Sequence, residues 1–294
     1  MKNPMRRMIR IRAYAKINLG LFIKEKRRDG FHEIETILLP IKLYDKINIE
    51  KSLNDIIIEC SEPSVPVHNK NLTYIAFQKL RERYPSKIKE GIKIYIEKNI
   101  PVGAGLGGGS SDAASVLLGV RNLWNIGVSN KILKMIASQL GSDVPFFIDC
   151  KPTLAKGRGE ILKEIDYNLK RWILLIYPDI NISTSWAYKN FNFILTNRIK
   201  NINLSNLIKK NILKFRNLIF NDLEIPVFSK YPQLREIKEN LYKSGAEFAL
   251  MSGSGSCLYG LFKDKNKAEK VSKKFKEFGN VYLARQVLTR KIFE

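Results

Sequence analysis

The feature that most constrains this chain is a run of glycines between a predicted strand and a predicted helix. Five glycines fall within the seven positions from Gly103 to Gly109, and Ser110, Ser111 and Asp112 follow before an alanine-rich segment. Glycine adopts positive φ and lets a backbone approach a ligand closely, and the first turn of a helix presents unpaired N–H groups to an anion. Because five glycines cost much conformational entropy, a plain flexible turn is the weaker alternative. The run therefore predicts a phosphate-binding loop.

Three known phosphate sites fit this loop poorly. The stretch from Gly103 to Gly108 matches the dinucleotide fingerprint G-x-G-x-x-G, which requires an acidic residue about 20 positions later, yet residues 113–142 contain no Asp or Glu. A Walker A loop requires Gly-Lys-Ser/Thr, and no lysine follows these glycines. The protein-kinase motifs H-R-D and D-F-G are absent from the sequence. The sequence thus argues against all three classes of site.

Hydrophobic periodicity predicts an α+β chain. Alternation and β-branched runs predict antiparallel strands over 8–15, 17–23, 34–39, 46–50 and 56–60, and a further strand over 91–98. Helical spacing predicts helices over 71–84 and 129–140, and residues 144–148 form a short apolar segment. Beyond a basic, turn-rich stretch over 151–170, the pattern predicts strands over 172–177, 247–251, 258–262 and 281–287 and helices over 231–243 and 265–278. The polar region up to about Lys214 shows no clear order of elements.

Length and composition predict an ordinary globular chain. At roughly 150 residues per domain, 294 residues make one large or two modest domains, and we place a boundary between 1–165 and 166–294. The three cysteines show no metal-binding or disulfide spacing, so a reducing compartment is expected. Only two histidines are present, which argues against a His-rich metal site. No apolar run reaches the roughly 18 residues that a membrane helix needs.

The charge of the chain raises a second hypothesis. Lys and Arg number 51 against 28 Asp and Glu, a formal net charge of +23, and so basic a surface attracts polyanions such as nucleic acids. The basic residues are spread along the chain, and no RNA-binding signature or zinc-knuckle spacing is present. Compositional drift is the simpler explanation, and we expect no specific nucleic-acid partner. Filter binding to RNA at two salt concentrations separates the two hypotheses.

Three motifs in order resemble those of the GHMP small-molecule kinases. The glycine loop reads PVGAGLGGGSSDAA over 101–114, AYAKINLGL stands at 13–21, and LMSGSGSC stands at 250–257. The segments RRDGFHEIETI at 27–37 and GSDVPFF at 141–147 are similar to those of one branch of the family. The first 24 residues are basic like a transit peptide, but the motif at 13–21 lies within them, so we expect a cytoplasmic enzyme without a removable leader.

The resemblance implies a fold and an activity. The expected architecture is a two-domain GHMP kinase, with an N-terminal domain like domain 2 of ribosomal protein S5, a ferredoxin-like C-terminal domain and the active site between them. The expected reaction is ATP-dependent phosphorylation of an alcohol, and in the branch concerned this alcohol is a cytidine diphosphate derivative of methylerythritol from non-mevalonate isoprenoid synthesis. ATP and Mg²⁺ are the implied cofactors. The sequence leaves monomer and homodimer open.

The resemblance also assigns catalytic roles to two residues. Asp143 corresponds to the base that accepts the hydroxyl proton, and Lys16 lies beside that hydroxyl and the transferred phosphate. A lysine near Asp143 would keep the carboxylate ionised and stabilise developing negative charge. The alternatives are that Asp143 only caps or braces the segment before Pro145 and that Lys16 is a solvated strand residue.

Substrate contacts follow from the same resemblance. Asn18 shares a strand face with Lys16, with an ordinary edge-strand asparagine as its alternative. His32 lies in the segment that holds the cytosine ring, with a structural role as its alternative. The family usually has tyrosine where this chain has Phe31, so stacking remains but the hydroxyl hydrogen bond is lost. A looser match places Tyr188 on the opposite face of the base, with core packing as its alternative. The remaining implied substrate contacts are Thr184, Gly253 and Ser254, a plain hairpin turn being the alternative for the last two.

The loop residues implied to bind the nucleotide form one continuous run. They are Pro101, Gly103, Ala104, Gly105, Leu106, Gly107, Gly108, Gly109, Ser110 and Ser111. The hydroxyls of Ser110 and Ser111 could bind phosphate or magnesium, although helix capping alone also explains them. The sequence names no metal ligand beyond these two.

Overall fold

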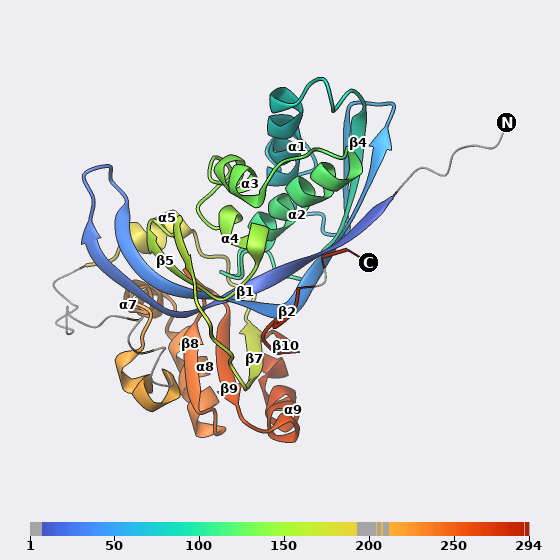
Figure 1. Ribbon diagram of the computed structural model, residues 1–294. Coiled ribbons are helices and arrows are strands. Elements are labelled where there is room, and N and C mark those ends of the chain that lie inside the picture. Colours follow the sequence, from blue (N-terminus) through green and yellow to red (C-terminus); the bar gives the residue numbers. More distant parts are fainter. Residues whose placement is uncertain (1–7, 193–203, 205–206, 208–211, 291, 294) are drawn as a thin grey trace.

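The chain folds around two β-sheets that share a layer of apolar side chains. The computed structural model describes residues 8–192, 204, 207, 212–290 and 292–293. Figure 1 shows the long strands β1 and β2 running between an upper group of helices and the second sheet below them. Part of the polar region that precedes Lys214 therefore lies outside the described residues.

The first sheet is mixed and has six strands in the described residues. They are β1 (Ile9–Lys26), β2 (His32–Ser52), β3 (Ile56–Cys60), β4 (Gly91–Glu97), β5 (Thr153–Gly157) and β6 (Ile161–Glu164). The strand order is β3-β4-β2-β5-β6, and β1 pairs antiparallel with β2. The pairing of β1 with β2 shifts register after Tyr14 and between Asn18 and Leu21. These irregularities lie on either side of the stretch that carries Lys16 and Asn18.

Helices cover one face of this sheet. They are α1 (Leu72–Arg83), α2 (Gly108–Leu123), α3 (Asn130–Ala137) and α4 (Val144–Asp149). Side-chain oxygens of Asn71 and Ser129 accept backbone N–H bonds at the starts of α1 and α3, as expected of N-cap residues. Most α2 residues from Ser111 to Leu123 are apolar or small and buried, because this helix packs between the sheet and α1, α3 and α4.

The second sheet is antiparallel throughout and has the order β10-β7-β9-β8. Its strands are β7 (Trp172–Tyr177), β8 (Phe248–Met251), β9 (Leu258–Phe262) and β10 (Asn280–Ala284). Its helices are α5 (Thr184–Lys189), α7 (Glu224–Lys230), α8 (Pro232–Lys243) and α9 (Lys265–Lys274), with 3₁₀ turns at Ile212–Leu218 and Phe275–Phe278. The succession strand, helices, two strands, helix, strand is the ferredoxin-like pattern. The predicted two-domain α+β architecture is thus confirmed.

The two sheets meet through one apolar cluster. Ala15, Ile17 and Leu19 of β1 pack in it with Ile173 of β7 and Tyr259 of β9. The chain end then returns along the first sheet, where the Val287 backbone N–H donates to the Pro40 carbonyl oxygen at 2.9 Å. The shared core explains why β1 is buried on both faces over its middle third.

Several local expectations were wrong in detail. Residues 34–39 and 46–50 belong to one strand, and β3 pairs parallel with β4 rather than antiparallel. The basic stretch over 151–170 contains the β5–β6 hairpin of the first sheet. The predicted helix over 265–278 ends at Lys274 before a 3₁₀ turn, and the last strand ends at Ala284. Local patterns cannot report these changes, because strand direction and strand length are set by partners distant in sequence.

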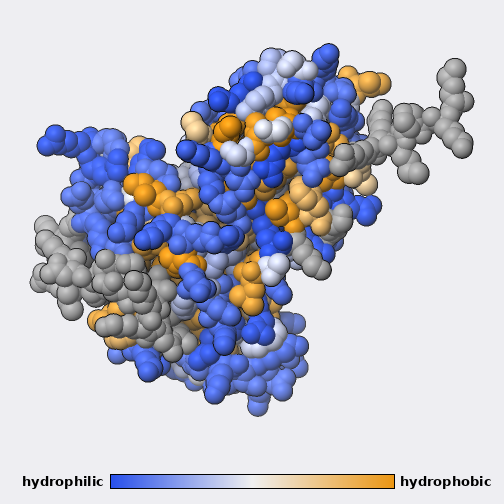
Figure 2. Space-filling view, in the orientation of Figure 1, coloured by the Kyte–Doolittle hydropathy of each residue, from blue (hydrophilic) through white to orange (hydrophobic). Residues whose placement is uncertain are grey.

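Hydrophilic side chains cover most of the face seen in Figure 2, and apolar side chains form small patches on the upper part and between the upper and lower parts. None of the helices in the described part of the chain is long and apolar enough to cross a membrane.

Candidate active site

A cavity of about 1000 Å³ opens where the two parts of the molecule meet. Its wall comes from β1 and β2, the glycine loop, the start of α4, helix α5 and the turn between β8 and β9. Every residue predicted to bind nucleotide or substrate lines this cavity except Ser111, which is fully buried beside it. Predictions from distant parts of the sequence therefore converge on one place.

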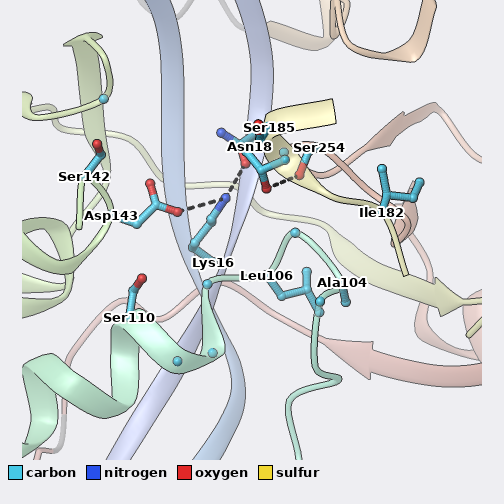
Figure 3. Close-up of a pocket in the computed structure, with 18 of the residues that line it drawn as sticks. Lys16, Asn18, Ala104, Leu106, Ser110, Ser142, Asp143, Ile182, Ser185 and Ser254 are labelled. Atoms are coloured by element: carbon cyan, nitrogen blue, oxygen red, sulfur yellow. Dashed lines mark hydrogen bonds and ion pairs between the residues drawn. The ribbon is translucent and has the colours of Figure 1, made fainter. Parts of the chain in front are cut away.

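Lys16 and Asp143 both line the cavity, and their side chains point towards each other (Figure 3). The Lys16 Nζ lies 3.6 Å from Asp143 Oδ2, and the two side chains are 5% and 37% exposed. Asp143 is the residue before α4, but its side chain makes no capping hydrogen bond. A role for the Asp143 carboxylate in capping this helix is therefore excluded, and the carboxylate is available to a ligand.

A short hydrogen-bond chain holds the Lys16 ammonium group. Lys16 Nζ donates to Asn18 Oδ1 at 2.6 Å, and Asn18 Nδ2 donates to Thr36 Oγ1 at 2.9 Å. The Thr36 hydroxyl donates in turn to the Gly20 carbonyl oxygen at 2.6 Å. Lys16 and Asn18 lie two positions apart on one strand and so share a face, as predicted. The sequence analysis missed Thr36, which fixes the Asn18 amide so that its oxygen points to Lys16.

The glycine loop packs against β1 and the turn after β8. Lys16 N–H donates to the Leu106 carbonyl oxygen at 2.9 Å, and Cys257 N–H donates to the Ala104 carbonyl oxygen at 3.2 Å. Gly105 has φ +75°, and a Cβ there would lie 2.1 Å from the Ser252 carbonyl oxygen. Only glycine fits at this close approach of two backbones. Helix α2 begins at Gly108, within the glycine run, so its first N–H groups lie at the cavity wall.

The turn between β8 and β9 closes the cavity on the side of Lys16. The Ser252 hydroxyl donates to the Gly105 carbonyl oxygen at 3.0 Å. A Cβ on Gly253 would lie 3.3 Å from Lys16 Nζ and 3.4 Å from Asn18 Oδ1, so this glycine lies directly against the hydrogen-bonded Lys16 and Asn18 side chains. The Ser254 hydroxyl shares a 2.8 Å hydrogen bond with the Thr184 hydroxyl. The turn therefore forms part of the cavity wall as well as connecting β8 to β9.

Asn221 is a buried residue that the sequence analysis missed and that holds this turn. Its Nδ2 donates to the carbonyl oxygens of Met251 at 2.9 Å and Gly253 at 2.7 Å, and its Oδ1 accepts the Leu223 N–H at 3.0 Å. The next residue, Asp222, accepts the Ile23 N–H of β1 at 2.7 Å. A pair of polar side chains therefore ties the turn to the strand that carries Lys16.

Asn221→Asp is expected to destabilise the protein by about 2–4 kcal/mol. The carboxylate keeps one acceptor for the Leu223 N–H but removes both donors and faces two carbonyl oxygens, and unsatisfied buried groups cost about 1–3 kcal/mol each. Urea unfolding at neutral pH measures the change. Asn54→Asp, the same substitution on an exposed turn, serves as the control, and equal stability of the two variants would contradict the account.

A buried ion cluster lies at the other end of the loop. Lys98 Nζ pairs with Asp45 and, at 2.8 Å, with Asp112, and the three side chains are almost fully buried. Burial lowers the pKa of Lys98, but the two carboxylates outweigh it and raise that pKa overall. Burial, reinforced by Asp45, raises the pKa of Asp112 to about 8. Asp45 also accepts the Ile100 N–H at 2.8 Å, so the cluster fixes the strand end that leads into the loop.

The predicted base-binding residues lie together at the end of the cavity formed by the β1–β2 hairpin. The His32 and Tyr188 rings are stacked with centroids 5.5 Å apart and an interplanar angle of 26°. Burial, together with the charge of Lys26, lowers the pKa of His32, so the imidazole is neutral near pH 7. Burial raises the pKa of Tyr188. Phe31 is 53% exposed at the mouth of this region.

A second arm of the cavity extends towards the start of α1. It is lined by Ser64, Val65, Pro66, Lys70, Asn71 and Leu72. The Asn71 amide donates to the Pro66 carbonyl oxygen at 2.6 Å and its oxygen accepts the Thr73 N–H at 2.8 Å, which joins the loop to the helix. The sequence analysis missed this arm, because its residues carry no charge pattern or motif and only the fold brings them to the glycine loop.

Comparison with known proteins shows the family to which the chain belongs. The family model of the GHMP kinases N terminal domain matches residues 71–150, and that of the GHMP kinases C terminal domain matches residues 203–281. These models together cover more than half of the chain, and with the relatives below they show that the chain belongs to the GHMP kinase family.

Similar curated proteins belong to one branch of that family. A protein named 4-diphosphocytidyl-2-C-methyl-D-erythritol kinase from Azobacteroides pseudotrichonymphae is 45% identical over 85% of this chain and 91% of its own length. A protein of the same name from Prosthecochloris aestuarii is 40% identical over 90% of this chain and 92% of its own length. A crystal structure of 4-(cytidine 5'-diphospho)-2C-methyl-D-erythritol kinase superposes with a TM-score of 0.81 at 30% identity, covering 94% of this chain and 98% of that one.

Proposed function

We propose that this chain transfers the γ-phosphoryl group of ATP to the 2-hydroxyl of 4-diphosphocytidyl-2-C-methyl-D-erythritol. The products are the 2-phosphate and ADP, in the non-mevalonate route to isoprenoids. The observation that carries the proposal is the Lys16–Asp143 pair, 3.6 Å apart and facing the glycine loop within one cavity. The names of the relatives support the choice of acceptor.

The cavity has room for both substrates. The ATP phosphates would lie over Gly103 to Ser110, where positive-φ glycines and the first N–H groups of α2 can contact them. The adenine would then enter the arm beside Val65 and Leu72, and the cytosine would lie at the His32 and Tyr188 end. This arrangement brings the acceptor hydroxyl to Lys16 and Asp143, between the two nucleoside ends.

Two side chains would act on the reacting atoms. Asp143, uninvolved in capping and ion-paired with Lys16, accepts the proton of the hydroxyl as it attacks the γ-phosphorus. Lys16 stabilises the charge that develops on the transferred phosphoryl group. Asn18 and Thr36 hold the lysine in place. Gly253 leaves the space beside Lys16 Nζ that a larger residue would fill.

The residues present fit a magnesium ion bound with the ATP phosphates. Mg²⁺ takes oxygen ligands and commonly uses one or two protein groups, with substrate phosphates and waters completing its shell. Ser110 lines the cavity, and the buried Oδ1 of Asp112 has no hydrogen-bond partner among the described residues. We propose that Ser110 and the ionised form of Asp112, which a bound cation favours, would hold the ion. When bound, Mg²⁺ would neutralise charge on the β- and γ-phosphates.

The cellular setting follows the same proposal. Cys60, Cys150 and Cys257 are free thiols, which suits a reducing compartment, and we propose the cytoplasm. The proposed substrates are small molecules, and no nucleic acid or membrane takes part in the reaction.

Phosphorus NMR of the reaction mixture tests the proposed chemistry. With ATP and 4-diphosphocytidyl-2-C-methyl-D-erythritol, we expect a new phosphomonoester resonance in the acceptor while its diphosphate resonances persist, together with ADP. Release of cytidine monophosphate, or inorganic phosphate as the sole new species, would contradict phosphoryl transfer to the acceptor hydroxyl.

A further inference from the structure

Arg158 lies in the cavity wall, but it belongs to none of the sequence motifs and has no role in the proposed phosphoryl transfer. It occupies the turn between β5 and β6, and its guanidinium carbon lies 4.6 Å from the centroid of the Phe31 ring. An arginine stacked on an aromatic ring is held in a fixed plane while the N–H groups at its edge remain available. Phe31 thus orients a cation within the substrate region.

The Arg158 guanidinium is only lightly engaged within the protein. In the part of the chain that the structure describes, its one ion pair joins Nε to Glu160 Oε1 at 3.7 Å, beyond hydrogen-bond distance, and the side chain is 39% exposed. Among the described residues, no hydrogen bond formed by the guanidinium of Arg158 is present, although its backbone N–H donates to Glu160. The two terminal nitrogens are therefore free to bind an anion in bidentate fashion.

The position of this turn is specific. A Cβ on Gly159, the next residue, would lie 3.9 Å from the Ser142 Cβ, and Ser142 precedes Asp143. Phe31, on the other side, precedes His32. Arg158 therefore lies between the end that would hold the base and the pair that would act on the hydroxyl.

The charged side chains that line this end of the cavity are basic, and the carboxylates of Glu160 and Asp29 lie beside Arg158 outside the lining. Lys26 and Lys189 line the same region as Arg158, whereas the carboxylates that line the cavity are Asp112 and Asp143. Asp112 is bound by Lys98 on the far side of the glycine loop, and Asp143 is paired with Lys16. A ligand that crosses from His32 to Lys16 meets cations along the way.

We propose that Arg158 binds the diphosphate group of the cytidine diphosphate substrate, with its guanidinium plane supported by Phe31. The inference rests on the proposed function, since only an acceptor whose base and hydroxyl are joined by a diphosphate places two phosphates at this point. Arg158 is thereby a specificity residue that distinguishes a nucleoside diphosphate derivative from an uncharged alcohol.

Binding of cytidine 5'-diphosphate and of cytidine, measured by calorimetry in the full chain, tests the proposal. Arg158→Ala is expected to weaken binding of the diphosphate by about 10- to 100-fold, the range for a hydrogen bond to a charged group, and to change cytidine binding less than twofold. Arg158→Lys should give an intermediate loss, because it keeps the charge without the planar fork. Lys156→Ala, which removes an exposed cation of β5 outside the cavity lining, should leave both affinities unchanged.

Two results would overturn the proposal. One is an unchanged affinity of Arg158→Ala for cytidine 5'-diphosphate, and the other is an equal loss for cytidine and the diphosphate, which would place Arg158 at the base instead. Turnover of 4-diphosphocytidyl-2-C-methyl-D-erythritol by the unaltered chain, measured alongside, reports separately on the proposed function. An active enzyme with unaffected Arg158→Ala binding therefore removes the inference alone.

Discussion

Asp143→Asn is expected to lower kcat by about 10²–10⁴-fold, the usual range for a general base, while most of the affinity for the acceptor is retained. Asparagine keeps the shape and one acceptor oxygen of Asp143 but cannot take the hydroxyl proton. Lys16→Met should give a loss of similar size, because it removes the charge held 2.6 Å from Asn18 Oδ1 and 3.6 Å from Asp143. Steady-state kinetics with both substrates, together with the melting temperature of each variant, measures these effects.

The control for the Asp143 substitution lies in the short helix that follows it. Asp149→Asn makes the same change at the other end of α4, where the carboxylate is 31% exposed and pairs with Lys134. It should leave kcat nearly intact. Phosphoryl transfer through a loose transition state needs little help from a base, so a small effect at Asp143 with a large one at Lys16 would assign catalysis to charge stabilisation. Near-normal turnover in both variants would refute the catalytic roles of Lys16 and Asp143.

Gly109→Val is expected to raise the KM for ATP by at least about tenfold without lowering the melting temperature appreciably. Apart from its chain neighbours and the backbone of its own helix, no atom of the described residues lies within 4 Å of a Cβ at this position. Its φ lies outside the left-handed range, so the added side chain projects towards the space that a ligand would fill. A phosphate seated on the first turn of α2 would lose its close approach to the backbone. Gly107→Val is a poorer test, because φ is +74° there and a Cβ would lie 2.7 Å from the Phe147 ring.

The matched control is Gly127→Val, in a loop outside the cavity, where a Cβ likewise meets no described residue within 4 Å other than its chain neighbours. Both variants should unfold near the temperature of the unaltered chain, and only Gly109→Val should lose nucleotide affinity. Unchanged ATP binding in a folded Gly109→Val protein would show that the phosphates lie elsewhere.

The local chemistry of the site was predictable from the sequence because glycine and charge patterns are local signals. Glycines that require positive φ, such as Gly105, mark the loop by themselves. The strand period places Lys16 and Asn18 on one face before any partner is known. Residue roles such as that of Asp143 came instead from the resemblance between ordered motifs, and they remain predictions.

The rest of the site depends on contacts distant in sequence. The sequence around Asn221 shows no unusual pattern. Its role arises only in the fold, where it lies beside β1 and binds Gly253 in the turn after β8, more than 30 residues further along the chain. Arg158 belongs to a stretch that was interpreted as a connecting segment, whereas the pairing of β5 with β2 brings the turn after β5, and with it Arg158, beside Phe31. Strand register and strand order bring these residues together, and both depend on the pairing of the whole sheet.

The measurement that tests the account most directly is ADP release with four acceptors supplied separately: 4-diphosphocytidyl-2-C-methyl-D-erythritol, mevalonate, homoserine and galactose. Each assay contains ATP and Mg²⁺ at the same concentrations, and kcat/KM is compared. We expect the cytidine diphosphate compound to be phosphorylated with a kcat/KM far above those of the other three. Preferred turnover of mevalonate, homoserine or galactose would contradict the proposed substrate while leaving the kinase class in place.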